Sequence, residues 1–153
     1  MKELNLEKNE EVIYTSNMYF TNAEINQKEY SVYLTNLNLI LYKQTKRLFR
    51  EPKIELLKFP LTNFSLVDNE PFFEVFKNDE ICHCGIRVIY QRKIIELTFE
   101  DDGEEDYTIK SKTLGNLLTK EINKIIKTPK ICPLCNTLIA DDMLFCQSCG
   151  TKI

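Results

Sequence analysis

The sequence predicts a mainly β fold that ends in one α-helix and is followed by a small cysteine-rich unit. Between about Glu10 and Lys110, short segments of alternating apolar and polar residues are separated by polar turns, which is typical of strands. From about Lys112 to Lys127 the apolar residues recur every three or four positions, which indicates a helix. Two Cys-x-x-Cys motifs follow Pro129, so we divide the chain into units 1–128 and 129–153.

The first clear hairpin joins two apolar segments through a polar turn. Val32 and Leu34 precede the tetrapeptide 35–38, and Leu39 and Leu41 follow it. Threonine and asparagine favour turns because their side chains bond to nearby backbone groups. We therefore expect two antiparallel strands with a tight connection.

Further hairpins are predicted downstream. Residues 72–76 and 86–90 bracket a polar turn at 77–80, and residues 95–99 alternate like a half-buried strand. The acidic tract 100–106 would form another hairpin tip that leads into a strand starting at Tyr107. Calcium binding at this tract is disfavoured, because the ligand spacing and terminal glutamate of an EF-hand loop are missing.

The predicted helix has one apolar face that would pack on the sheet. This face consists of Leu114, Leu117, Leu118, Ile122, Ile125 and Ile126. Lys120, Asn123, Lys124 and Lys127 fall on the opposite face, and lysines near a helix end also suit the negative end of its dipole. Pro129 cannot continue the helix, so we place the boundary between the two units at 128–130.

Four of the six cysteines have the spacing of a metal site. Cys132 and Cys135 form one Cys-x-x-Cys motif, and Cys146 and Cys149 form a second one ten residues later. A gap of two residues lets both thiolates face one ion, and four thiolates complete the tetrahedral set that zinc prefers. The sequence therefore predicts one structural zinc ion, which this short segment needs in order to fold.

The cysteine pattern also resembles a known family. Cys-Pro-x-Cys followed by Phe-Cys-x-x-Cys-Gly closely resembles the short zinc ribbons at the termini of many prokaryotic proteins, over residues 131–152. Asn136 stands where that family usually has glycine, and asparagine tolerates the same positive φ that Gly150 adopts freely. Leu138, Ile139 and Phe145 are the only substantial apolar core that the segment offers.

Three other roles for the cysteine unit are disfavoured. A redox dithiol needs only one Cys-x-x-Cys motif and a βαβ setting that the pattern does not predict. A catalytic zinc needs an open coordination position, which four thiolates close. Nucleic-acid binding needs basic or aromatic surface, and Asp141 and Asp142 make the segment slightly acidic. A structural or protein-docking role is the simpler interpretation.

The first unit resembles the pleckstrin-homology (PH)-like superfold. Strands followed by one helix are its layout, and residues 11–14, 33–41 and 59–64 look like the early strands of GRAM-like and bacterial PH-like domains. The resemblance covers roughly residues 10–126. It implies a strongly bent antiparallel sheet, or half-barrel, capped by the helix, and a platform that binds peptides, proteins or lipid headgroups and rarely carries catalysis.

A basic cluster lies between two of the predicted strands. It consists of Lys43, Lys46, Arg47, Arg50 and Lys53 around Leu48 and Phe49, with only Glu51 opposing. Lipid headgroups could bind through Lys46, Arg47, Phe49 and Arg50, although a solvated loop is the simpler interpretation. PH-like domains that bind phosphoinositides place basic residues in the loop after the first strand, where this chain has none at 21–27, and this weakens a lipid role.

The single histidine, His83, lies between Cys82 and Cys84. Alternate residues of a strand point to opposite faces, so the three side chains cannot converge on one metal ion without a distortion of the strand or ligands from elsewhere. Ordinary packing is the expected role. With no second histidine, most familiar general-base arrangements have no candidate.

Composition and charge narrow the function further. The formal net charge is −3, which disfavours a whole-protein attraction to nucleic acid. Neither a signal-peptide core nor a stretch of about 20 apolar residues is evident, so we expect a cytoplasmic protein without a transmembrane segment. The prediction is a non-catalytic zinc-binding adaptor for a protein or peptide partner. The alternatives are a nucleic-acid-associated ribbon protein and a peripheral module on anionic membranes.

Overall fold

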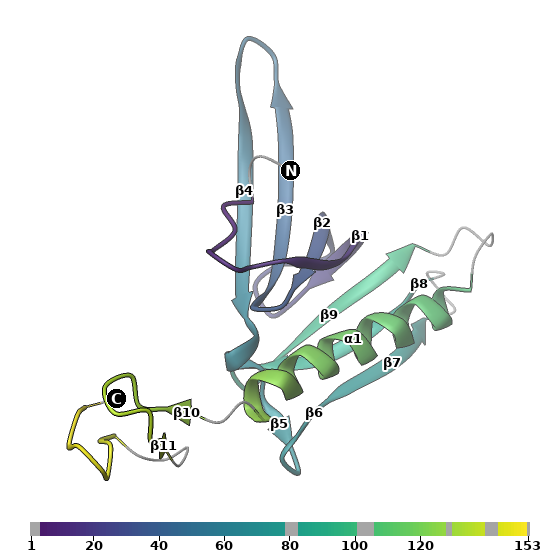
Figure 1. Cartoon of the computed structure of the whole chain (residues 1–153). Coiled ribbons are helices and arrows are strands. Elements are labelled where there is room, and N and C mark those ends of the chain that lie inside the picture. The colour runs from purple at the N-terminus through teal and green to yellow at the C-terminus, as the bar shows by residue number, and fades with distance from the viewer. Residues whose placement is uncertain (1–3, 79–82, 101–105, 128–129, 140–143, 153) are drawn as a thin grey trace.

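The computed structural model describes residues 4–78, 83–100, 106–127, 130–139 and 144–152. Its main element is a seven-stranded antiparallel sheet (Figure 1). The strands are β1 (Val12–Thr21), β2 (Lys28–Thr35), β3 (Asn38–Arg47), β4 (Arg50–Pro60), β7 (Phe73–Asn78), β8 (His83–Tyr90) and β9 (Lys93–Glu100). Their order is β4-β3-β2-β1-β9-β8-β7, so β4 and β7 are the edges and the sheet is open.

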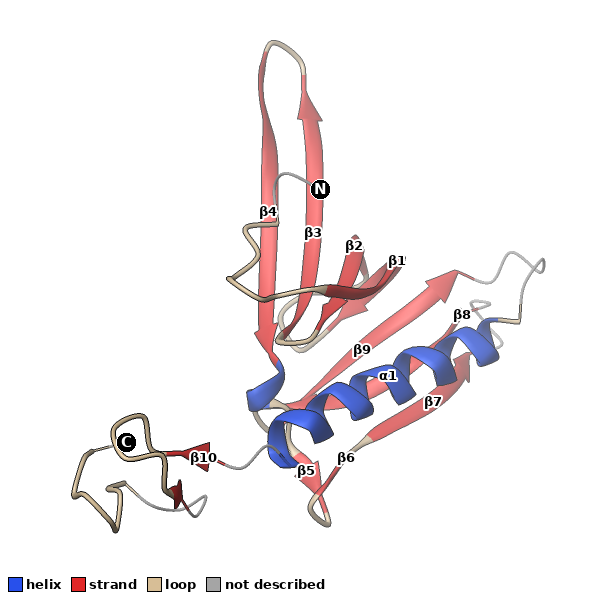
Figure 2. Ribbon diagram, in the orientation of Figure 1, coloured by secondary structure: helices blue, strands red, loops and turns tan. Residues whose placement is uncertain are grey.

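One long helix and several short elements complete the structure. Helix α1 (Tyr107–Lys127) follows the sheet and packs against β7, β8 and β9, as Figure 2 shows in blue against red. The short elements are the 3₁₀ turn η1 (Leu61–Asn63) and the strands β5 (Leu66–Val67), β6 (Glu70–Pro71), β10 (Lys130–Ile131) and β11 (Leu138–Ile139). Strands β10 and β11 form a two-stranded sheet of their own.

Strand β1 joins the two halves of the large sheet. It pairs with β2 along nearly its whole length, but it pairs with β9 only through Tyr19–Thr21. The halves β1–β4 and β7–β9 therefore diverge away from this contact, as Figure 1 shows. This bent, open antiparallel sheet with one C-terminal helix confirms the predicted mainly β fold class and is consistent with a PH-like half-barrel.

The core fills the space between the two halves of the sheet and α1. It contains inward-facing residues from both halves together with Leu114, Leu118 and Ile122 of the helix. Phe20 and Leu97, which are register partners across the β1–β9 contact, are both completely buried. Ile95, Leu97 and Phe99 are buried on the inward face as predicted, whereas Thr98, on the other face, is also buried.

The predicted hairpins agree with the register of the sheet. Leu34 pairs with Leu39 across the turn after β2, and Val75 pairs with Ile86 between β7 and β8. Lys77 and Asn78 belong to β7 rather than to the turn; residues 79–82 lie outside the described residues. The segment 59–64, predicted as a strand, ends as one at Pro60 and continues as η1.

The start of the helix was predicted wrongly. Helix α1 begins at Tyr107, where the sequence suggested a further strand. The reason is an N-terminal cap: Oδ1 of Asp106 accepts hydrogen bonds from the backbone N–H groups of Thr108 at 3.0 Å and Ile109 at 3.3 Å. Such a cap satisfies amides that have no partner inside the helix. Most of the acidic tract, residues 101–105, lies outside the described residues.

The buried face of α1 is narrower than its apolar residues suggested. Leu118 and Ile122 are buried, whereas Ile126 is 38% exposed and belongs to the surface. Gly115 lies on the buried face, and a Cβ atom there would fall 2.3 Å from the ring of Phe73. The helix and β7 therefore approach to a distance that only glycine permits.

Glu10 ties the N-terminal segment to the sheet. Its carboxylate accepts hydrogen bonds from the backbone N–H of Glu7 (2.9 Å), the hydroxyl of Thr35 (2.7 Å), the amide of Asn38 (2.7 Å) and the ammonium of Lys58 (3.2 Å). Burial raises the pKa of Glu10, but these four donors outweigh it and lower the pKa to about 2. The carboxylate is thus ionised and fully partnered inside the fold.

We expect Leu118→Ala to lower the free energy of unfolding by about 2–5 kcal/mol, because it leaves a cavity in the core. Leu118 is 2% exposed. Lys120→Ala, on the exposed face of the same helix, should leave stability unchanged. Thermal melts of both variants test this. A Leu118→Ala protein that melts like the wild type would identify α1 as a partner-binding helix rather than part of the core.

Glu10 should make stability depend on acid pH. Its pKa is about 2 in the folded chain against 4.5 for an ordinary glutamate, so its contribution is complete above about pH 4.5 and disappears as the pH falls towards 2. Between pH 6 and pH 3, wild type should lose about 1–3 kcal/mol more than Glu10→Gln in urea unfolding. Glu29→Gln, at an exposed position, is the control and should behave like wild type. Equal losses in wild type and Glu10→Gln would contradict this role.

Candidate metal centre

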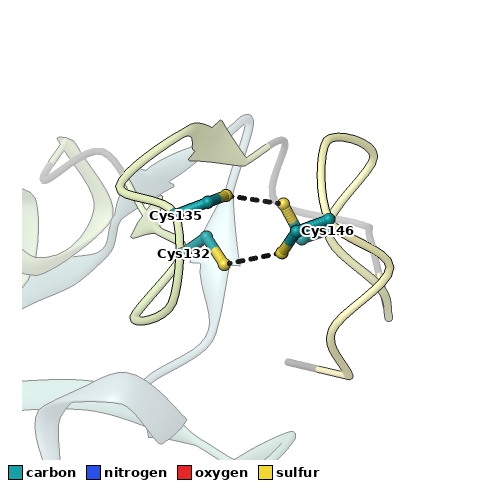
Figure 3. A group of neighbouring side chains, drawn as sticks. Cys132, Cys135 and Cys146 are labelled. Atoms are coloured by element: carbon teal, nitrogen blue, oxygen red, sulfur yellow. Dashed lines mark hydrogen bonds between the residues drawn. The ribbon is translucent and has the colours of Figure 1, made fainter.

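The four cysteines of the two motifs meet at one point. The Sγ atoms of Cys132 and Cys149 are 3.6 Å apart, and those of Cys135 and Cys146 are 3.5 Å apart. All four Sγ atoms lie within 4.8 Å of one another. Figure 3 shows Cys132 and Cys135 pointing towards the motif that contains Cys146. Each close pair thus joins one motif to the other, as a shared ligand set requires.

These distances fit a tetrahedral metal ion. With metal–sulfur bonds of about 2.3 Å, tetrahedral geometry places neighbouring sulfurs about 3.8 Å apart, close to the two distances given above. All four thiols are free, so no disulfide competes for them. The four cysteines can therefore hold one metal ion and leave no coordination position open.

The two Cys-x-x-Cys motifs adopt the same hydrogen-bonded turn. In each, the backbone N–H of the first cysteine donates to the carbonyl of a threonine five residues later, from Cys132 to Thr137 at 2.9 Å and from Cys146 to Thr151 at 2.8 Å. The cluster is therefore built from two equivalent half-sites, which face each other across the metal position.

The residue after each motif closes the turn. The N–H groups of Asn136 and Gly150 donate to the carbonyls of Cys132 and Cys146 at 2.9 and 2.8 Å. Both residues have positive φ, 56° for Asn136 and 71° for Gly150. The expectation that asparagine can replace glycine at the first turn is confirmed. No atom lies within 4 Å of a Cβ built on Gly150, so backbone conformation rather than space favours glycine there.

A short antiparallel pairing holds each half-site. Ile131 pairs with Leu138 in β10–β11, and Phe145 pairs with Lys152 in an isolated bridge. The paired residues directly flank each turn, one before the first cysteine and one after the threonine. Each pair of cysteines thus lies in a turn whose two ends are joined by an antiparallel β pairing.

Thr137 and Thr151 are residues of the site that the sequence analysis missed. Their Oγ1 atoms lie 3.2 Å from the Sγ atoms of Cys135 and Cys149. A hydroxyl in this position can donate to a thiolate and support it as a ligand. The signal was present in the sequence as a repeated pattern, Cys-x-x-Cys followed by asparagine or glycine and then threonine.

The electrostatics of the cluster favour a cation. The hydroxyl and the backbone N–H of Thr137 lower the pKa of Cys135 to about 6, and Thr151 lowers the pKa of Cys149 in the same way. At Cys146, backbone N–H groups lower the pKa, but burial and the sulfurs of Cys135 and Cys149 outweigh them and raise it to about 11. Neighbouring thiolates thus repel one another, and a bound cation removes this repulsion.

The cysteine unit has less apolar core than the sequence suggested. Phe145 is 55% exposed and is not a core residue, and Ile139 is only half-buried. Cys132 and Cys146 are themselves buried, whereas Cys135 and Cys149 are exposed. The buried centre of the described part of this unit is therefore the sulfur cluster itself.

The other predicted candidates lie elsewhere. Lys46, Arg47 and Arg50 lie at the end of the β3–β4 hairpin, with Phe49 in its turn, so most of the predicted loop is paired strand. Cys84 is buried under the helix, with Sγ 3.6 Å from the hydroxyl of Ser111, as ordinary packing predicts. The side chain of His83 is not among the described ones, and Cys82 lies outside the described residues.

Comparisons with known proteins identify no family. No protein-family model and no curated protein matches this sequence. The chain is similar to a solved structure of Vav1, described as inhibited by an allosteric inhibitor, at 13% identity with a TM-score of 0.49. The alignment covers 83% of this chain and 34% of the Vav1 chain, so this chain spans about a third of that chain's length. Within the described residues, no helix has the length and apolar character needed to cross a membrane.

We expect one metal ion per purified chain, because four sulfurs at tetrahedral spacing form a single site. Elemental analysis of the purified protein measures this directly. Cys146→Ser combined with Cys149→Ser removes one half-site and should abolish retention of the ion. The single substitutions Thr137→Val and Thr151→Val should each weaken metal affinity by roughly 10-fold through the lost support of a thiolate ligand. Ser148→Ala is the control on the same turn. Retention of the ion by the double cysteine variant would contradict the assignment.

Proposed function

We propose that this chain is a non-catalytic adaptor in which a PH-like unit and a C-terminal zinc ribbon present surfaces to a protein or peptide partner. The closed set of four sulfur atoms carries the proposal. A catalytic metal needs an open position for water or substrate, and the four cysteines occupy every tetrahedral position. The ion would therefore hold the ribbon together rather than act on a substrate.

The donor set favours zinc over other metals. Thiolate ligands select soft or borderline ions over magnesium and calcium, and tetrahedral four-sulfur geometry suits Zn²⁺. Four free thiols also persist best in a reducing compartment, which supports a cytoplasmic location. We also propose that the chain is divided into units 1–128 and 129–153. The second unit, the ribbon, would fold only when zinc is bound.

We propose that the partner docks on the ribbon, because its surface carries several exposed apolar side chains. Among the described residues of the ribbon, the large apolar side chains that are exposed are Ile131 (53%), Leu134 (73%), Leu144 (70%) and Phe145 (55%). Leu134 lies inside the first turn, and Leu144 and Phe145 directly precede the second. Apolar side chains concentrated on the surface of so small a unit are typical of a protein contact, whereas nucleic-acid contact would call for basic residues.

Affinity capture from the source cell tests the adaptor. Leu134→Ser combined with Leu144→Ser should retain zinc, because neither residue contributes a ligand. The amount of partner that this variant captures should fall at least about 10-fold. Ser148→Ala, an exposed polar position on the second turn, is the matched control and should capture as much as wild type. Equal capture by wild type and by the leucine variant would show that these leucines of the ribbon are not the docking surface.

Two further measurements separate the parts of this proposal. A chain truncated to residues 1–127 should still melt cooperatively, since its core is complete without the ribbon. Failure of that fragment to melt cooperatively would contradict the domain division while leaving the metal site intact.

Nuclease treatment tests the alternative function. Loss of the captured partner after this treatment would identify a nucleic-acid-associated ribbon protein.

A further inference from the structure

The β3–β4 hairpin extends well beyond the sheet. Strand β2 pairs with β3 only as far as Tyr42, whereas β3 and β4 continue to pair with each other up to Arg47 and Arg50. The outer half of the hairpin thus has no other strand of the described sheet beside it, and Figure 1 shows it projecting from the rest of the fold. This arrangement holds the tip away from the body of the protein.

The tip of this hairpin is apolar and fully exposed. Leu48 and Phe49 form the two-residue turn, and their exposed fractions are 85% and 99%. Neither side chain can contribute to the core at such exposure. Two-residue hairpin turns ordinarily carry asparagine, aspartate or glycine, so stability of the fold does not explain these two residues.

Backbone conformation makes Phe49 more unusual. Its φ is 61°, in the left-handed region that disfavours bulky side chains. Nine described residues other than glycine have positive φ, and the other eight are polar: Asn5, Asn9, Gln27, Asp68, Asn69, Gln91, Arg92 and Asn136. Only at this turn does the described chain place an apolar side chain at positive φ. A strained residue of this kind points to a function.

Basic residues surround the apolar tip. Residues 43–53 contain five basic side chains and one acidic side chain, a net charge of +4, in a chain whose total is −3. All the described charges from Lys46 to Lys53 are exposed. Glu55, the next acidic residue of β4, forms an ion pair with Lys28. The end of the hairpin is therefore a local positive region on an acidic protein.

We propose that the β3–β4 tip is a wedge that inserts Leu48 and Phe49 into the surface of an anionic bilayer, with the flanking basic residues against the acidic headgroups. Apolar groups of interfacial segments are buried about 5–10 Å deep. Strands rise about 3.3 Å per residue, so inserting the two turn residues brings Arg47 and Arg50 to headgroup level. This goes beyond the adaptor role and depends on neither the zinc ion nor the ribbon.

Two features favour a bilayer over other anionic partners. Single-stranded nucleic acid is held in basic grooves lined by stacking rings, whereas this tip is convex and Leu48 has no stacking face. The loop after β1 carries no basic residue, and Oδ1 of Asn22 is engaged by the backbone N–H groups of Glu24 and Ile25. Contact through the hairpin is therefore contact with the membrane surface rather than capture of one headgroup in that loop.

The substitution Phe49→Trp provides a direct reporter, because the chain contains no tryptophan. Its indole emission should shift to the blue with vesicles of phosphatidylcholine containing about 30 mol% phosphatidylserine, and should not shift with pure phosphatidylcholine. The shift should weaken as salt is raised, because the attraction is screened. Unchanged emission with the anionic vesicles would overturn the proposal.

A paired variant separates binding from folding. Leu48→Asn combined with Phe49→Gly installs the residues that such a turn favours, so the protein should melt at the same temperature as wild type or higher. Cosedimentation with the anionic vesicles should fall at least about 10-fold. Arg47→Glu combined with Arg50→Glu should reduce it by a similar factor, while Lys120→Ala, on the helix, should not change it.

The contrary outcomes are equally specific. Vesicle binding that survives in the Leu48→Asn, Phe49→Gly variant would show that the tip is not the contact. Quenching of the Phe49→Trp emission by an oligothymidine strand, with no response to anionic vesicles, would show that the tip binds nucleic acid instead. Either result would overturn the bilayer assignment and leave the metal-site experiments unaffected.

Discussion

The architecture depends on the short pairing between β1 and β9. Three residues at the end of β1 join the two halves of the sheet, and two of the register partners, Phe20 and Leu97, are completely buried. Because pairing stops there, the halves separate and leave a wedge-shaped interior. Helix α1 fills it with Leu114, Leu118 and Ile122. The strand order leaves β4 at a free edge, and the long β3–β4 hairpin projects from this edge.

The local pattern of apolar residues and the local spacing of cysteines were sufficient to predict much of this structure. The hairpin at Leu34 and Leu39, the alternating strand β9 and the apolar face of α1 follow from periodicities that burial imposes on a sequence. The four cysteines could be assigned from spacing, because two residues between thiols is the separation that brings both to one ion. In each case one physical requirement acts over fewer than about 20 residues and leaves a visible pattern.

Features that depend on a single contact could not be predicted. The first turn of α1 has the residues of a strand, and the cap from Asp106 stabilises it as helix. Ile126 has the right spacing for the buried face, yet its side chain is 38% exposed. Thr137 and Thr151 looked like ordinary polar residues, because their contacts with sulfur appear only once the turn has closed. The bend itself depends on where one pairing ends.

The unequal exposure of the cysteines gives the sulfur cluster an inner and an outer side. In each half-site the first cysteine is buried and the second is exposed. An oxidant or alkylating reagent arriving from solvent therefore meets Cys135 and Cys149 before Cys132 and Cys146. Damage to the centre would therefore begin at these two positions, one in each half-site, so that either half can be the first to lose a ligand.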